Sequence, residues 1–189
     1  MKQFLLLIFL FGASAAFSQL KTTTSSIRSY LDQVVDAYPY GFSNLKGERL
    51  GSDPNTIAFS SSLVLPGALE TQVLGYPGKR KTYWVWECKY RELEDFDAFK
   101  KMYRAVYNDI AGGAVVKNPN SRYVSAMPYE APTETQRLWS NQFRLNEKLA
   151  PHSNLVIDLV AENVGFVWVI WLRVYDKERD TDMRPTEPE

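Results

Sequence analysis

The chain has 189 residues, of which 22 are basic and 22 acidic, so its formal net charge at pH 7 is zero. A balanced charge gives no general attraction to nucleic acid or to anionic lipid, and we expect no nucleic-acid partner. Cys88 is the only cysteine. A single cysteine excludes an internal disulfide, and we interpret Cys88 as a buried apolar residue.

The first 18 residues have the pattern of a secretory signal peptide, in which a basic residue precedes an apolar run at residues 4–11 and then small residues. This run and every later one are too short to cross a bilayer, so we expect no membrane span after cleavage. The small residues predict cleavage between Ser18 and Gln19, and cleavage after Ala15 is the alternative. The secreted or periplasmic remainder has the size of one domain, predicted over residues 19–175.

The first half of this domain begins with a predicted helix. Apolar residues recur at helical spacing after Ser26 and stop at Pro39, which predicts an amphipathic helix over residues 27–38. A loop rich in Gly, Asn and Ser follows, with a short strand expected at residues 42–45. Alternating apolar residues between turn signals predict three further strands, at residues 57–65, 69–76 and 82–91.

The second half has a similar order of predicted elements. A second helix is expected over residues 94–111, ended by two glycines. The segment 114–133 contains three prolines and is predicted to be irregular. Charged residues at 176–189 predict a disordered tail. Between these segments we expect three closing strands, at residues 135–145, 154–162 and 165–175.

These elements predict an α+β fold: a two-layer sandwich in which an antiparallel sheet of about six strands carries two helices on one face. The order helix, loop, three strands occurs twice, and each half ends in a tryptophan-rich strand, at residues 83–90 and 166–175. We interpret this order as an α-β-β-β duplication. The alternative is that an α+β chain shows such an order by chance.

The two tryptophan-rich strands differ in their predicted faces. Residues 165–175 are apolar on both faces, whereas Glu87 and Lys89 alternate with the tryptophans of the first strand. Packing of one face against the helices predicts a core role for most of the tryptophans. The opposite face, which includes Trp171, then needs a cover: a long loop, a second subunit or a ligand.

The sequence has no recognised catalytic or metal-binding pattern. His152 is the only histidine, no serine nucleophile elbow is present, and no nucleotide- or calcium-binding loop occurs. We therefore predict a non-catalytic protein without metal or cofactor. A carboxylate pair for hydrolysis stays open, with Asp158 as its first member because it interrupts an apolar strand. The ordinary interpretation places Asp158 on the polar face of that strand.

Two loops mix aromatic residues with Asn, Ser and Arg, a composition found at binding interfaces and also in loops that fold back on their own domain. These loops and the opposite sheet face supply five candidate residues for binding a ligand or partner: Tyr40, Phe42, Tyr123, Tyr129 and Trp171. The leading hypothesis is a small exported binding domain whose partner is a protein or a small apolar ligand. The alternatives are an exported hydrolase that uses a carboxylate pair and a structural homodimer subunit.

Overall fold

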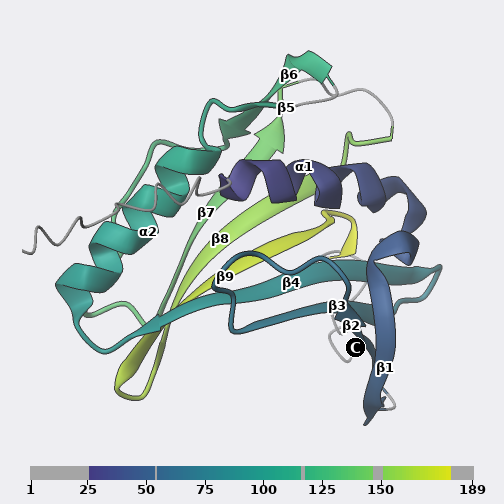
Figure 1. Cartoon of the computed structure of the whole chain (residues 1–189), viewed down its shortest axis with the longest axis horizontal. Coiled ribbons are helices and arrows are strands. Elements are labelled where there is room, and N and C mark those ends of the chain that lie inside the picture. The colour runs from purple at the N-terminus through teal and green to yellow at the C-terminus, as the bar shows by residue number, and fades with distance from the viewer. Residues whose placement is uncertain (1–25, 54, 116–117, 147–150, 180–189) are drawn as a thin grey trace, which may run out of the picture.

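The computed structural model describes residues 26–53, 55–115, 118–146 and 151–179. The predicted signal peptide, its cleavage site and most of the predicted tail lie outside these residues. In chain order, the elements are α1 (Ile27–Ala37), η1 (Tyr38–Tyr40), η2 (Ser43–Leu45), β1 (Lys46–Asp53), β2 (Thr56–Ser61), β3 (Glu70–Pro77), β4 (Thr82–Leu93), α2 (Phe96–Ile110), β5 (Ala114–Val115), β6 (Asn118–Ser125), β7 (Leu138–Leu145), β8 (Leu155–Val164) and β9 (Val167–Asp176) (Figure 1).

The strands form one antiparallel sheet in the order β1-β2-β3-β4-β9-β8-β7-β6, and the two-residue β5 pairs with β6 at one edge. The predicted α+β class is confirmed. The expectation of about six strands is wrong, because eight strands of the described residues make up the main sheet. The two additional strands are β1 and β6, which lie at or next to the edges. The segment predicted as a short strand at residues 42–45 is largely the 3₁₀ helix η2.

Each half of the chain has one helix followed by an antiparallel run of strands. The last strands of the two halves, β4 and β9, pair with each other at the centre of the sheet. In this pairing Cys88 lies opposite Leu172, Glu87 opposite Arg173 and Lys89 opposite Trp171. This layout accommodates two equivalent halves, while the duplication itself stays a prediction.

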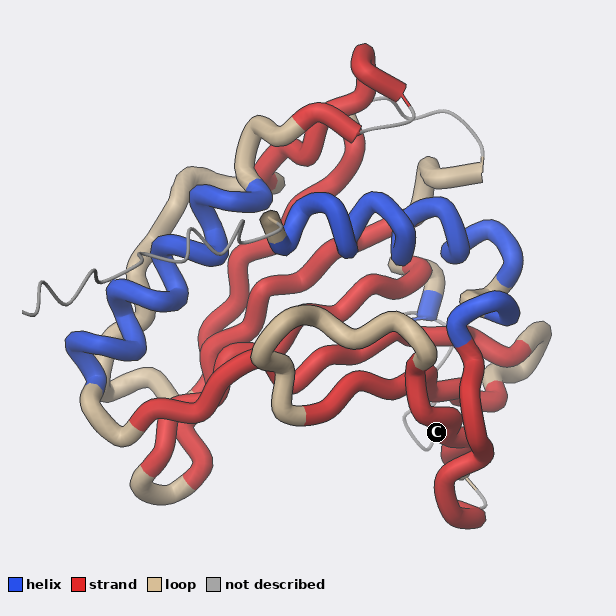
Figure 2. Tube along the Cα trace, viewed as in Figure 1, coloured by secondary structure: helices blue, strands red, loops and turns tan. Residues whose placement is uncertain are grey.

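Both predicted helices are confirmed, and their starts follow from capping side chains. The Ser26 hydroxyl accepts a hydrogen bond from the Arg28 backbone amide, and the Asp95 carboxylate accepts one from the Ala98 amide at 2.6 Å. These side chains satisfy amide groups that lack a partner in the first helical turn. Figure 2 shows the two helices in front of the strands, at the upper left and centre of the view.

The main hydrophobic core lies between the helices and one face of the sheet. It combines buried residues of α1 and α2 with alternate residues of the central strands, including Trp86, Cys88 and Leu172. Trp86 is fully buried and its indole nitrogen donates to the Ser61 hydroxyl at 3.2 Å. Cys88 is buried as predicted, and burial raises the pKa of its thiol to about 11.

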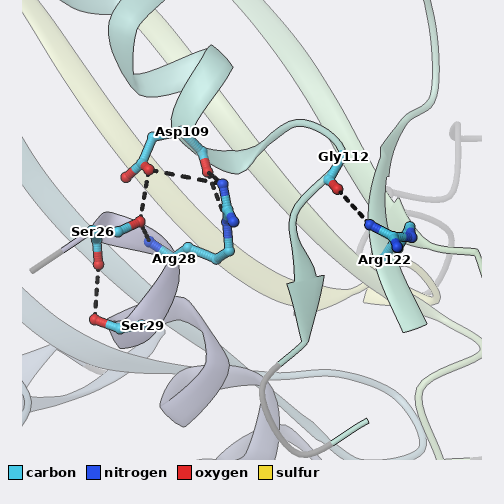
Figure 3. A network of polar contacts seen from close by, with 6 residues as sticks. All are labelled: Ser26, Arg28, Ser29, Asp109, Gly112 and Arg122. Atoms are coloured by element: carbon cyan, nitrogen blue, oxygen red, sulfur yellow. Dashed lines mark hydrogen bonds and ion pairs between the residues drawn. The ribbon is translucent and has the colours of Figure 1, made fainter. Parts of the chain in front are cut away.

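A polar network joins the start of α1 to the end of α2 (Figure 3). The Ser26 hydroxyl donates to the Asp109 carboxylate at 2.6 Å, and two Arg28 nitrogens donate to the Asp109 carbonyl oxygen at 3.0 and 2.7 Å. That carbonyl belongs to the last turn of α2, where helical acceptors lack amide partners. A Cβ atom on Gly113 would lie 2.1 Å from Arg28 Nε, so a side chain there would make the arginine shift. The network therefore fixes the two helices relative to each other.

Candidate functional site

A pocket of about 290 Å³ opens at one end of the sheet, where η1 faces the start of β4 and the end of β9. We call it the Tyr38 pocket. Its walls come from four segments that are far apart in the chain. The lining residues are Tyr38, Pro39, Gly41, Phe42, Lys81, Thr82, Tyr83, Trp84, Pro151 and Asp176.

The backbone on the η1 side of the pocket is strained. Gly41 and Phe42 both have left-handed backbone angles, with φ of 59° and 56°. Phe42 is the only residue other than glycine with positive φ among the described residues. Such a conformation costs about 1–3 kcal/mol, which burial of the Phe42 ring offsets because the side chain is 0% exposed. The turn thus keeps one aromatic ring in the pocket wall and returns the chain to the sheet.

Tyr38 forms the next part of the wall and is held on both sides by rings. Its ring packs edge-on against Phe42, with centroids 6.2 Å apart, and stacks on His152 at 5.9 Å. The His152 Nε2 atom lies 3.1 Å from the Val35 carbonyl oxygen, to which it donates. The only histidine of the chain therefore ties the segment before β8 to the end of α1 behind the pocket.

The floor of the pocket is built around Trp84. The ring leaves no room for side chains beside it, since a Cβ atom on Gly41 would lie 2.8 Å away and one on Gly75 would lie 2.6 Å away. The Lys46 ammonium lies 3.0 Å from the Trp84 ring centroid and 5.6 Å from that of Phe59. Burial lowers the pKa of Lys46. Ring and cation thus stabilise each other at the first edge of the sheet.

Charged groups line the mouth of the pocket. The Lys81 ammonium lies 3.2 Å from both the Asp176 and Glu178 carboxylates and 4.9 Å from the Tyr83 ring centroid. Burial opposes the charged form of Lys81, but hydrogen bonds to the two carboxylates raise its pKa. Burial and the nearby charge of Asp176 raise the pKa of Tyr38, so its hydroxyl stays protonated beside that carboxylate. The mouth therefore holds one ammonium and two carboxylates.

The opposite face of the sheet carries a second, smaller cluster to which no helix of the described residues contributes. Its buried members are Leu74, Val85, Val156 and Tyr175. Beside them runs a polar row, in which Arg173 of β9 is in register with Glu87 of β4 on one side and Asp158 of β8 on the other. Arg173 Nε also donates to the Glu87 carboxylate. Asp158 is 9% exposed, and an arginine strand separates it from the second carboxylate.

The five residues predicted from the sequence lie in four separate places. Tyr40 is 73% exposed on η1, next to the pocket, and Phe42 lines it. Tyr123 is fully buried and donates to the Asp32 carboxylate. Tyr129 is half-buried against Tyr107, with ring centroids 4.6 Å apart. Trp171 is half-buried on the opposite sheet face and donates to Glu162 at 3.0 Å. Only the first two residues are brought together.

Three residues that shape the pocket were not among the predicted ones: Lys81, Trp84 and Asp176. Lys81 belongs to a basic cluster that the sequence predicts to flank a strand. Trp84 alternates with its neighbours in the way that predicts a core residue. Asp176 opens the segment predicted to be a tail, whereas in the structure it is the last residue of β9. No local signal distinguishes these residues, because their role depends on meeting η1 in space.

Comparisons of the chain with protein-family models, with curated proteins and with solved structures found no match. In the part of the chain that the structure describes, no helix has the length and apolar character needed to cross a membrane. In that same part, no three His, Cys, Asp or Glu side chains are grouped so that they could hold a metal ion.

Proposed function

We propose that this chain is an exported, non-catalytic binding domain and that its binding site is the Tyr38 pocket. The observation that carries the proposal is a cavity of about 290 Å³ with aromatic walls and a charged mouth. Ligand pockets combine apolar walls with a few placed polar groups and usually measure about 300–1,000 Å³. The ligand is therefore small, with an apolar body that contacts Tyr38 and Trp84.

Support for the export part of the proposal comes from the pattern of residues 1–18, in which a basic residue, an apolar run and small residues follow one another. The proposal also includes the two-layer sandwich predicted from the sequence. Its support is that both helices share one buried cluster with a single sheet face, while the second cluster consists of strand residues alone. A pocket at the end of such a sheet needs no third layer.

The polar groups of the pocket favour binding over catalysis. Lys81 and Asp176 line the pocket and form an ion pair, so each of these charged groups already has a partner. The hydrolase alternative around Asp158 and the homodimer alternative stay predictions. Arg173 lies between Asp158 and Glu87 in register, which favours an ion-pair row over an acid–base pair.

Native mass spectrometry tests the proposal. The chain starting at Gln19, purified from an exported fraction, is expected to retain a bound molecule of small mass. The matched variants are Tyr38→Ala, which removes a pocket wall, and Tyr40→Ala, which removes an exposed ring two residues away. We expect the additional mass to disappear in Tyr38→Ala and to persist in Tyr40→Ala, with thermal melts confirming that both variants are folded.

Two results would contradict the proposal. One is a bound molecule that survives Tyr38→Ala, which would place the ligand elsewhere. The other is a bare mass together with an absence of amide shift changes at Tyr83 and Trp84 when fragment mixtures are titrated into the labelled chain. The second result would remove the pocket as a ligand site.

A further inference from the structure

The mouth of the Tyr38 pocket has the composition of a binding site for an ammonium group. Two carboxylate oxygens, from Asp176 and Glu178, lie 3.2 Å from the Lys81 nitrogen, and the Tyr83 ring centroid lies 4.9 Å from it. Carboxylates and an aromatic face together are the partners that organic cations select in proteins. In this structure the ammonium group of Lys81, from the same chain, occupies this site.

The two carboxylates are held in place by other groups than Lys81. The Asn154 side-chain amide donates to Glu178 at 3.0 Å. The Glu178 backbone amide also donates to Asp176 at 2.9 Å. The acceptors therefore keep their positions when the cation between them changes.

Lys81 itself is only weakly constrained. It follows the turn between β3 and β4, and its side chain is 49% exposed, close to the 52% of Glu178. Exposed ion pairs of lysine are weak, because a long flexible side chain must be ordered and water screens the charges. The Lys81 ammonium can thus be replaced by a similar group with little loss of stability.

The hydrogen-bond chemistry at the Lys81 nitrogen favours a cation over an anion. The two carboxylates there accept hydrogen bonds and donate none, so an incoming ammonium can donate to both of them. The other lysine near the pocket, Lys46, is engaged over Trp84 at the floor. An anionic ligand would have to approach two carboxylates without a second available cation among these residues.

Provided that the Tyr38 pocket is the binding site, we infer that its ligand carries an ammonium group, which takes the place of the Lys81 ammonium between Asp176 and Glu178. The apolar body of the ligand lies against the Tyr38 and Trp84 walls. The ammonium belongs either to a free small amine or to a lysine side chain of a partner protein.

The test is an NMR titration of the ¹⁵N-labelled chain starting at Gln19 with three probes of equal shape: benzylammonium, benzyl alcohol and benzoate. The amide signals of Tyr83 and Trp84 report binding. We expect the Kd for benzylammonium to be at least about tenfold lower than for benzyl alcohol, because hydrogen bonds to charged groups are stronger. Asp176→Asn should remove this preference, measured as the ratio of the two Kd values within the variant.

Two lysine variants distinguish direct competition between Lys81 and the ligand from a general effect of the positive charge on binding. Lys81→Met removes the internal ammonium and should tighten benzylammonium binding by up to about fivefold. Lys79→Met changes the same charge on the same exposed turn, outside the pocket lining, and should leave the Kd unchanged. If both variants change the Kd of benzylammonium equally, the inference that the ligand replaces the Lys81 ammonium is wrong.

The remaining outcomes distinguish the ammonium inference from the pocket itself. If benzyl alcohol or benzoate binds as tightly as benzylammonium, the ammonium inference is wrong and the pocket still binds small molecules. If none of the three probes shifts the signals in the wild type or in Lys81→Met, the proposed binding function fails as well. A free small amine and a lysine side chain of a partner protein both agree with the inference. Tighter binding of Nα-acetyl-lysine methylamide than of n-butylammonium would identify a partner's lysine as the source.

Discussion

The segments that follow the two helices have similar compositions and reach different structures. After α1, the chain turns through η1 and the left-handed pair at Gly41 and Phe42, which leaves a pocket beside β4. After α2, β5 and β6 return to the sheet edge, and Tyr123 becomes fully buried. Phe42 and Tyr123 both belong to the main hydrophobic core, and of the two only Phe42 also borders the pocket.

A tyrosine near a carboxylate occurs in both segments and has different consequences. Tyr38 lies near Asp176 at the mouth of the pocket, where both groups are partly exposed. Tyr123 bonds to Asp32, and both groups are buried between β6 and α1. A buried carboxylate is costly unless it is hydrogen-bonded. The core pair therefore contributes mainly to stability, and the pair at the mouth mainly to the electrostatics of the pocket.

The largest expected effect comes from breaking the core pair. Tyr123→Ala removes a fully buried ring and leaves Asp32 without that donor, so we expect the free energy of unfolding to fall by about 3–5 kcal/mol. Tyr123→Phe keeps the ring and should cost about 1–3 kcal/mol. Urea denaturation measures both. A loss below about 1 kcal/mol in Tyr123→Ala would mean that the buried pair does not hold α1 to the sheet.

Gly41→Ala should have the next largest effect. The new Cβ atom would lie 2.8 Å from Trp84 at a residue with φ of 59°, and we expect a loss of about 1–3 kcal/mol. Gly112→Ala is the matched control, because Gly112 has φ of 70° with no atom within 4 Å of an added Cβ. The control should show the backbone strain alone. Equal losses in thermal or urea denaturation would show that Trp84 moves freely, contrary to a rigid pocket floor.

Tyr38 and Tyr123 should differ in their effect on the free energy of unfolding at alkaline pH. Burial and the hydrogen bond to Asp32 raise the pKa of Tyr123 in the folded state. Its contribution to stability is therefore complete below the unfolded pKa of about 10 and is lost above it, by up to about 1.4 kcal/mol per pH unit. Tyr123→Phe should flatten this loss more than Tyr38→Phe, because Tyr38 is partly exposed. Urea midpoints between pH 8 and 11 measure it, and equal slopes in the two variants would contradict the comparison.

Deprotonation of Cys88 adds a loss of stability that begins at a lower pH than the loss from the tyrosines. The comparison of the two tyrosines must exclude it. Its folded pKa of about 11 exceeds the ordinary value of about 8.5, so its contribution declines as pH rises between these values. Carrying both tyrosine variants in a Cys88→Ala background removes that loss. A thiol reagent should also react slowly with the folded chain at pH 8, and rapid reaction would show that Cys88 is accessible.

The smallest expected effect on stability comes from the mouth of the pocket. Lys81→Met should lower the free energy of unfolding by no more than about 1 kcal/mol, because the ion pairs of Lys81 are exposed. The difference from the wild type should shrink further at high salt, where charges are screened. A large, salt-independent loss in urea denaturation would mean that Lys81 is structural, and it would weaken the case for its replacement by a ligand.

Local patterns in the chain were sufficient for the class of the fold and for most of its elements. Helical spacing with capping residues located α1 and α2, and alternation located β2 to β4 and β7 to β9. Strands β1 and β6 escaped prediction because Gly47, Gly51 and Pro119 interrupt any alternation. β1 is an edge strand, and β6 has only the two-residue β5 on its outer side. Strands at or near an edge tolerate such residues, so their sequences carry a weak signal.

The pocket could be predicted only in part. The aromatic loop pointed to Phe42, yet the other walls come from residues 81–84, 151 and 176, which no spacing in the sequence connects to it. Tyr123 and Tyr129 had the same loop composition and pack against their own domain instead. Helices and strands follow from contacts between near neighbours in the chain. The pocket depends on where the turns after α1 and β3 meet the end of β9, which the packing of the whole sheet sets.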